Sequence, residues 1–167
     1  MITSVRIVGA GLIGTSVALA LKAEGVEVEI IDQDSAAQML ARDLVQATSI
    51  ENPEVILLAL PVSQIFEVLK SESSLYPNSI LMDVGSTKSE LQVKVDQLSE
   101  VRERFVGTHP MAGREVSGPT AARADLFVGR AWPVIKSTYT SSDAIEKARE
   151  VIALCGATAY EIGRAHV

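Results

Sequence analysis

A glycine-rich segment near the start of the chain, Gly9-Ala10-Gly11-Leu12-Ile13-Gly14, separates two stretches with different patterns. Residues 4–8 form a short run rich in β-branched side chains, whereas residues 13–23 carry apolar side chains at helical spacing. The segment matches the pattern G-x-G-x-x-G, which is a weak signal alone but has meaning when it directly follows a strand and opens a helix. Because it does both here, the sequence predicts a dinucleotide-binding loop in an α/β fold.

The three glycines of this loop have separate expected roles. Gly9 permits the tight turn, Gly11 lets the backbone approach a pyrophosphate, and Gly14 lets the helix pack close to the strand. The start of the helix, with Leu12 and Ile13, offers free N–H groups and a positive dipole end to phosphates. All five are candidate cofactor-binding residues. The alternative is a glycine turn without a ligand, and sites for FAD or a mononucleotide share the pattern.

The rest of the chain alternates short apolar runs with segments of helical periodicity. This alternation predicts a doubly wound, mostly parallel sheet with helices on both faces, which is the Rossmann arrangement, and 167 residues suit one such domain. Pro133 has no N–H for a sheet ladder, so we expect its strand at a sheet edge. The expected strands are residues 4–8, 26–31, 55–60, 79–84, 103–106, 131–136 and 158–162, and the expected helices are residues 13–23, 35–45, 62–70, 87–101 and 142–154.

Asp32 ends the second expected strand, about 20 residues beyond the glycine loop. At this place an acidic side chain hydrogen-bonds the ribose hydroxyls of NAD and repels the 2′-phosphate of NADP. The neighbouring Gln33 and Asp34 supply no cation for that phosphate, so we predict NAD as the cofactor, with NADP less favoured. Leu60 and Pro61 end another expected strand and are further candidate cofactor-binding residues.

Two more candidates follow later strands, at the edge where ligands bind in a doubly wound sheet. Ser86 comes directly after Asp83-Val84-Gly85 and can face the cofactor, although a serine there is also a common helix cap. His109 lies in the segment Gly107-Thr108-His109-Pro110-Met111-Ala112-Gly113. A neutral imidazole there could accept a proton from a substrate hydroxyl, and the alternative is a structural histidine in a tight loop.

Composition argues against several other classes of protein. The chain has 15 Lys plus Arg against 21 Asp plus Glu and a net charge of −6, so a general nucleic-acid-binding role is not expected. The single cysteine, Cys155, excludes an internal disulfide framework, and no second His or Cys lies at metal-ligand spacing from His109. Glycines interrupt the apolar residues 1–25, which argues against a signal peptide or membrane anchor and indicates a cytoplasmic protein.

Four segments occur in the order GAGLIG, LALPV, DVGSTK and GTHPMAGREVSG. Together they resemble the prephenate/arogenate dehydrogenases of tyrosine biosynthesis, and the resemblance covers essentially the whole chain. The G-x-G-x-x-G pattern occurs in many families. The segment DVGS-x-K, followed about 20 residues later by G-x-HPMAG, is much more specific.

This resemblance implies NAD-dependent oxidation of the ring hydroxyl carbon of prephenate or arogenate, with loss of CO2 and aromatisation of the ring. On the matching positions, His109 would be the catalytic histidine that hydrogen-bonds the ring hydroxyl. Ser86 would help to position that hydroxyl, His109 and the nicotinamide. Glu115 matches an acidic residue at the mouth of the active site, with a substrate-binding or gating role.

The resemblance also implies partners and a second domain. Members of the family usually continue into an all-helical C-terminal domain that forms a homodimer and contributes contacts to the substrate carboxylate. We expect that domain to be absent from this chain, with residues 1–167 forming the dinucleotide-binding half. Two alternatives stay open: another NAD(P)-dependent dehydrogenase of the β-hydroxyacid or imine-reducing type, and a non-catalytic NAD-binding module.

Overall fold

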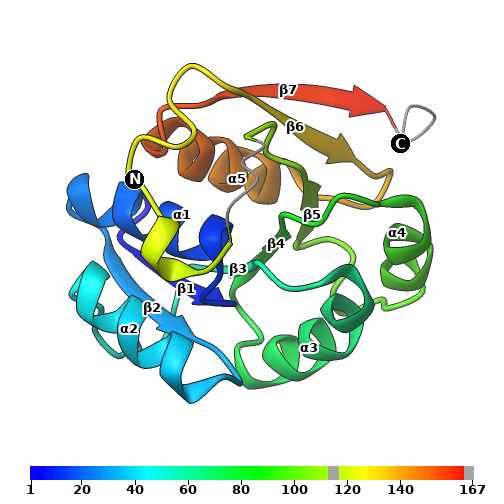
Figure 1. The fold of residues 1–167 in the computed structure, drawn as a ribbon. Helices are drawn as coiled ribbons and strands as arrows, with labels where there is room; N and C mark the ends of the chain where they lie inside the picture. Colours follow the sequence, from blue (N-terminus) through cyan, green and yellow to red (C-terminus); the bar gives the residue numbers. More distant parts are fainter. Residues whose placement is uncertain (113–116, 164–167) are drawn as a thin grey trace.

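The computed structural model describes residues 1–112 and 117–163 and places seven strands of these residues in one sheet (Figure 1). The strands are β1 (Ser4–Val8), β2 (Glu27–Ile31), β3 (Val55–Leu58), β4 (Ile80–Asp83), β5 (Phe105–Thr108), β6 (Ala131–Lys136) and β7 (Thr158–Gly163). Their order is β2-β1-β3-β4-β5-β6-β7. Neighbouring strands run parallel except for β5 and β6, which are antiparallel. The predicted doubly wound, mostly parallel sheet is confirmed.

Helices cover both faces of this sheet. The helices of the described residues are α1 (Leu12–Ala23), α2 (Ser35–Val45), α3 (Val62–Leu75), α4 (Ser89–Asp96), α5 (Ser142–Leu154) and the short 3-10 helix η1 (Pro119–Ala121). Helices α1 and α5 pack on one face, and α3 and α4 pack on the other (Figure 1). Helix α2 packs against β2 and α1. None of the described helices is both long and apolar enough to cross a lipid bilayer.

Successive side chains of the central strands enter two different hydrophobic clusters. Leu57 and Met82 pack beneath α1 and α5, whereas Ile56 and Leu81 pack beneath α3 and α4. All four are fully buried, because a parallel strand that is covered on both faces has no solvent side. The continuous apolar runs of the sequence therefore mark the central strands. The carboxyl ends of these parallel strands meet at one edge of the sheet, where ligands bind in such folds.

Most predicted boundaries agree with the structure to within a few residues. Four elements agree to the residue, namely 4–8, 35–45, 131–136 and 142–154. The predicted helix 87–101 is shorter in the structure, because α4 begins only at Ser89 and ends at Asp96. The residues before Ser89 are held in the loop that follows β4, which is described below with the candidate site.

The prediction that Pro133 marks a sheet edge is wrong, because β6 lies between β5 and β7. The carbonyl oxygen of Pro133 accepts the backbone N–H of His109 at 3.0 Å, just beyond the end of β5. Only the reciprocal bond, from the N–H that proline lacks, is lost from this antiparallel pair. Since the loss falls where the β5 ladder ends, an interior strand tolerates proline here.

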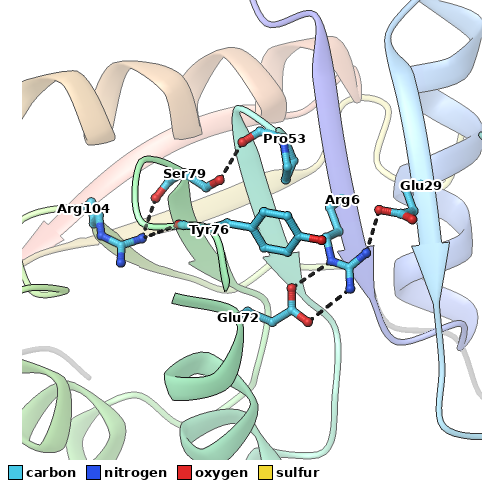
Figure 2. A network of polar contacts seen from close by, with 7 residues as sticks. All are labelled: Arg6, Glu29, Pro53, Glu72, Tyr76, Ser79 and Arg104. Atoms are coloured by element: carbon cyan, nitrogen blue, oxygen red, sulfur yellow. Dashed lines mark hydrogen bonds and ion pairs between the residues drawn. The ribbon is translucent and has the colours of Figure 1, made fainter. Parts of the chain in front are cut away.

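A buried ionic network joins β1, β2 and α3 (Figure 2). Arg6 donates its Nε–H to Glu72 at 2.8 Å and a terminal N–H to Glu29 at 2.6 Å, and its guanidinium lies 5.1 Å from the centroid of the Tyr76 ring. Arg6, Glu29 and Glu72 are all buried, with no more than 9% of each residue exposed. Burial opposes the charge on Arg6, but the hydrogen bonds to the two glutamates outweigh it and raise the pKa of the guanidinium.

This network explains why the predicted helix 62–70 is longer in the structure, as α3. Glu72 is buried through its ion pair, so this turn of the helix carries no apolar signal in the sequence. Arg104 stabilises the same end of the helix, because it donates to the backbone carbonyl oxygens of Tyr76 and Ser79 at 3.2 and 2.9 Å (Figure 2). Charged groups, rather than apolar periodicity, fix the C-terminal end of α3.

Replacing Arg6 with Met is expected to lower the free energy of unfolding by about 3–5 kcal/mol, because Glu29 and Glu72 would stay buried without a cation. Urea denaturation, followed by circular dichroism, measures this loss. Arg149→Met is the matched control, since it removes an exposed ion pair with Glu161 and should cost about 0–1 kcal/mol. Equal losses in the two variants would contradict the stabilising role of the buried network.

Candidate functional site

A pocket of about 790 Å³ lies at the edge of the sheet where the parallel strands end. Four loops line it: residues 11–13 of the glycine loop, residues 59–62 after β3, residues 84–86 after β4 and residues 109–112 after β5, together with Ser117. These are the four segments that the sequence analysis singled out. The fold therefore brings Leu60, Pro61, Ser86 and His109 into one pocket with the glycine loop.

Two glycines of the loop are required by close backbone contacts. Gly9 has a φ of +114°, and a Cβ atom there would lie 2.0 Å from the carbonyl oxygen of Ala59. A Cβ atom on Gly14 would lie 2.0 Å from the carbonyl oxygen of Gly9. The backbone N–H of Gly9 also donates to the carbonyl oxygen of Ile31 at 2.8 Å, which ties the loop to the end of β2. These contacts agree with the predicted tight turn and close helix packing.

Gly11 differs from its two neighbours, because a Cβ atom on it would meet nothing within 4 Å. It lines the pocket and is the N-cap of α1, where no side chain caps the helix. The first N–H groups of α1, including those of Leu12 and Ile13, have no acceptor within the helix. An open backbone face beside a helix N-terminus fits the phosphates of a dinucleotide.

The structure places Asp32 against the glycine loop rather than in the lining of the pocket. One carboxylate oxygen accepts the N–H of Ala10 at 2.7 Å, and the other accepts the N–H of Asp34 at 2.8 Å. Gln38 accepts the backbone N–H of Asp32 at 2.8 Å. Each carboxylate oxygen keeps a lone pair that can accept a further hydrogen bond. The carboxylate is thus fixed beside the loop and can still accept from ribose hydroxyls.

Ser86 is exposed at the pocket and does not cap a helix. Helix α4 begins at Ser89 with Lys88 as its N-cap, and no side chain makes a capping hydrogen bond there. The alternative interpretation of Ser86 as a helix cap is therefore wrong. Gly85 precedes it, and a Cβ atom on Gly85 would lie 2.9 Å from Cδ1 of Ile65. A glycine at this position lets the Ser86 loop pass close to α3.

His109 is half-buried and borders two pockets. Besides the first pocket, it lines a second of about 410 Å³, which it shares with residues 86–89, Lys88 among them, and with apolar residues such as Ile135 and Ile162. Its Nδ1 atom is buried and has no hydrogen-bond partner among the described residues. His109 therefore lies between a space that leads to the glycine loop and a more apolar space beside β6 and β7.

A buried ion pair, which the sequence analysis did not assign a role, lies behind Ser86. Asp83 is fully buried at the end of β4, and its Oδ2 atom accepts from the Lys88 ammonium and from the N–H of Gly85. Burial raises the pKa of the Asp83 carboxyl and lowers the pKa of the Lys88 ammonium, and their mutual attraction opposes both shifts. An acidic residue that ends an otherwise apolar run was the available signal.

Glu115 lies outside the described residues, so its expected place at the mouth of the site stays a prediction.

The chain matches the protein family described as prephenate dehydrogenase, nucleotide-binding domain, over residues 17–161. Among curated proteins it is similar to one of Streptomyces niveus named "Probable prephenate dehydrogenase NovF". The two are 36% identical over 154 residues, which cover 90% of this chain and 42% of the relative.

Two solved structures are similar over nearly the whole chain. One is prephenate dehydrogenase from Aquifex aeolicus in complex with hydroxyphenyl propionate and NAD+, with a TM-score of 0.89, 25% identity and coverage of 99% of this chain and 62% of that one. The other is arogenate dehydrogenase from Synechocystis, with a TM-score of 0.88, 25% identity and coverage of 98% and 61%. The chain spans about half the length of the relatives that it matches.

Gly11→Ala is expected to weaken NAD binding by at least about tenfold, or about 1.4 kcal/mol, because the added methyl group occupies the open face of the loop. The thermal stability of the Gly11→Ala variant should fall only slightly, since the methyl group meets no protein atom within 4 Å. Gly14→Ala should instead lose about 1–3 kcal/mol of stability or more, through its clash with Gly9. Calorimetric titration and thermal denaturation measure the two effects. Unchanged NAD affinity in Gly11→Ala would contradict this loop as the binding site.

Proposed function

The chain belongs to the prephenate dehydrogenase family, and we propose on this basis that it binds NAD and supports the oxidative decarboxylation of prephenate or arogenate. The product would be 4-hydroxyphenylpyruvate or tyrosine, and the chain would form the cofactor-binding half of the enzyme. One observation carries the proposal: His109 and Ser86 share a pocket with the open side of the glycine loop. A dinucleotide with its phosphates on α1 can therefore extend toward both side chains.

The residues that would hold NAD fit its separate parts. The open face of Gly11 and the first N–H groups of α1 suit the pyrophosphate, and the fixed carboxylate of Asp32 suits the ribose hydroxyls. Leu60 and Pro61 line the pocket between the glycine loop and Ser86 with apolar surface. When bound, the nicotinamide ring accepts a hydride from the substrate carbon that carries the hydroxyl.

His109 has the chemistry that the substrate hydroxyl requires. A neutral imidazole accepts a hydrogen bond from the hydroxyl and takes up its proton as the hydride leaves the same carbon, which makes that carbon a better hydride donor. Ser86 lies beside it in both pockets and can hold the hydroxyl and the imidazole in line. Oxidation of the carbon, followed by loss of CO2, gives an aromatic ring, which drives the reaction forward. The second, more apolar pocket can exclude water from the ring.

His109→Asn is expected to lower the turnover number about 10²–10⁴-fold, while NAD affinity stays within about twofold, because the imidazole acts on the substrate and not on the cofactor. The assay follows NADH formation by the chain with NAD and prephenate, and then with NAD and arogenate. The other histidine of the chain is the matched control, and His166→Asn should keep full activity.

Full activity in His109→Asn would exclude the proposed mechanism and favour another type of dehydrogenase. NAD binding without turnover of either substrate by the unaltered chain would make it a cofactor-binding half that needs its helical domain for activity, and would strengthen the alternative of a non-catalytic NAD-binding module. Turnover of only one of the two substrates would identify which of them the chain uses.

Asp32→Ala is expected to weaken NAD binding and to reduce the preference for NAD over NADP by at least about tenfold. Two unit charges about 4 Å apart interact by about 1–4 kcal/mol near a protein surface, so the carboxylate opposes a 2′-phosphate by an amount of this size. Asp34→Asn is the matched control, because it removes a neighbouring exposed charge while an asparagine still caps α2. If the preference for NAD over NADP in Asp32→Ala equals that of the control, Asp32 does not bind the ribose hydroxyls.

A further inference from the structure

Asp83 touches both halves of the candidate site. It is the last residue of β4 and is fully buried, and it lines neither of the two pockets that contain Ser86 and His109. Its side chain contacts the loop that carries Ser86, and its backbone contacts the strand that leads to His109. No role is assigned to this residue by the proposed function.

The carboxylate of Asp83 binds the loop that carries Ser86 at two points. The Oδ2 atom of Asp83 accepts the N–H of Gly85 at 3.0 Å and also accepts from the ammonium of Lys88. Ser86 and Thr87 lie between these two points and are exposed. Because both ends of a short loop are bound to one buried oxygen, the direction in which Ser86 projects depends on Asp83.

The backbone of Asp83 holds the end of β5. Its carbonyl oxygen accepts the hydroxyl of Thr108 at 2.6 Å, and the Thr108 oxygen in turn accepts the indole N–H of Trp132 at 2.9 Å. Asp83 is also paired with Gly107 in the ladder between β4 and β5. Thr108 directly precedes His109, so these bonds fix the backbone from which the imidazole projects.

The energetics of the ion pair support a geometric role. Two charges removed from water lose much of their hydration, and a buried ion pair is often no more stable than apolar residues of similar size. Lys88 is only 3% exposed, and Asp83 is not exposed at all. An apolar pair could fill this space at similar stability, but only directional hydrogen bonds can fix the loop.

We propose that Asp83 is a positioning residue for the proposed reaction, which holds Ser86 and His109 at a fixed separation through Lys88 and Thr108. It does so without contact to cofactor or substrate. The proposal rests on the proposed function for its kinetic consequence, but its structural consequence can be measured without turnover.

The first experiment removes both charges together, in the double variant Asp83→Asn/Lys88→Met. Lys88 lines the second pocket, and methionine keeps the apolar stem of that side chain. A single change at either position leaves the other charge buried and unpaired and can prevent folding, whereas the double variant leaves none. We expect a melting temperature close to that of the unaltered chain, NAD affinity within about twofold, and a turnover number about 10–100-fold lower, because small errors in alignment are costly. Glu90→Gln/Lys94→Met removes an exposed ion pair within α4, the helix that follows Lys88, and should change none of these values.

The second experiment tests the link through Thr108. Thr108→Val removes the hydroxyl that bridges Asp83 and Trp132 at nearly unchanged volume, and it should lower the turnover number with little effect on NAD affinity. Thr108→Ser keeps the hydroxyl and should restore most of the turnover. Equal activity of the valine and serine variants would overturn this part of the proposal.

The third measurement does not depend on turnover. The chain contains one tryptophan and two histidines, so its indole N–H and imidazole resonances are few enough to assign by nuclear magnetic resonance. With NAD present, the double variant should shift the resonances of His109. Thr108→Val should shift the indole N–H resonance of Trp132, which loses its acceptor. The Glu90→Gln/Lys94→Met control should shift neither.

Unshifted resonances, or a double variant with unaltered turnover, would overturn the proposal. A loss of activity proportional to the fraction of unfolded protein would also overturn the proposal, because an ion pair that only stabilises the fold would behave in this way. If the unaltered chain binds NAD but turns over neither substrate, it acts as a cofactor-binding half alone, and the resonances still decide whether Asp83 fixes the site. If it does not bind NAD, the proposed function fails.

Discussion

The close approach of three backbone segments at the end of β1 underlies the rest of the structure. Gly9 contacts the carbonyl oxygen of Ala59 after β3, and Gly14 of α1 packs against Gly9, at separations that no side chain permits. This contact sets the start of α1 directly beyond the strand ends. It leaves Gly11 with its open side toward the pocket, and it brings the loop after β3 alongside. The pocket exists because these backbones touch.

Charged side chains support the candidate site, but the candidate phosphate site itself uses none. The chain has a net charge of −6, and its candidate phosphate site uses backbone N–H groups and a helix dipole instead of basic side chains. Two buried ionic groups support the candidate site: Arg6 with its two glutamates joins α3 to the sheet, and Asp83 with Lys88 holds the loop that carries Ser86. The first stabilises a helix whose beginning lines the pocket, and the second shapes the loop at the pocket itself.

Sequence reasoning succeeded where the signal is local or periodic. The glycine loop, the central strands and α5 follow from residue spacing, and the four loop segments were expected together because parallel strand ends share one edge. Sequence reasoning failed where a residue distant along the chain determines the position of a strand or the end of a helix. Pro133 lies inside the sheet because β5 ends opposite it, and α3 continues past residue 70 because Arg6 pairs with Glu72. Neither partner is adjacent in sequence, so no local pattern reveals it.

The sequence by itself determined the fold class, the place of the phosphate loop, and the residue types available at the strand ends, because backbone propensity and apolar period act over a few residues. The tertiary structure alone decided which of these residues share a pocket and how they are held. Ser86 is free of a capping role because Asp83 and Lys88 fix the loop around it, and His109 borders two pockets because β6 turns back against β5. Both results arise from contacts between residues distant along the chain, whose geometry only the packed sheet sets.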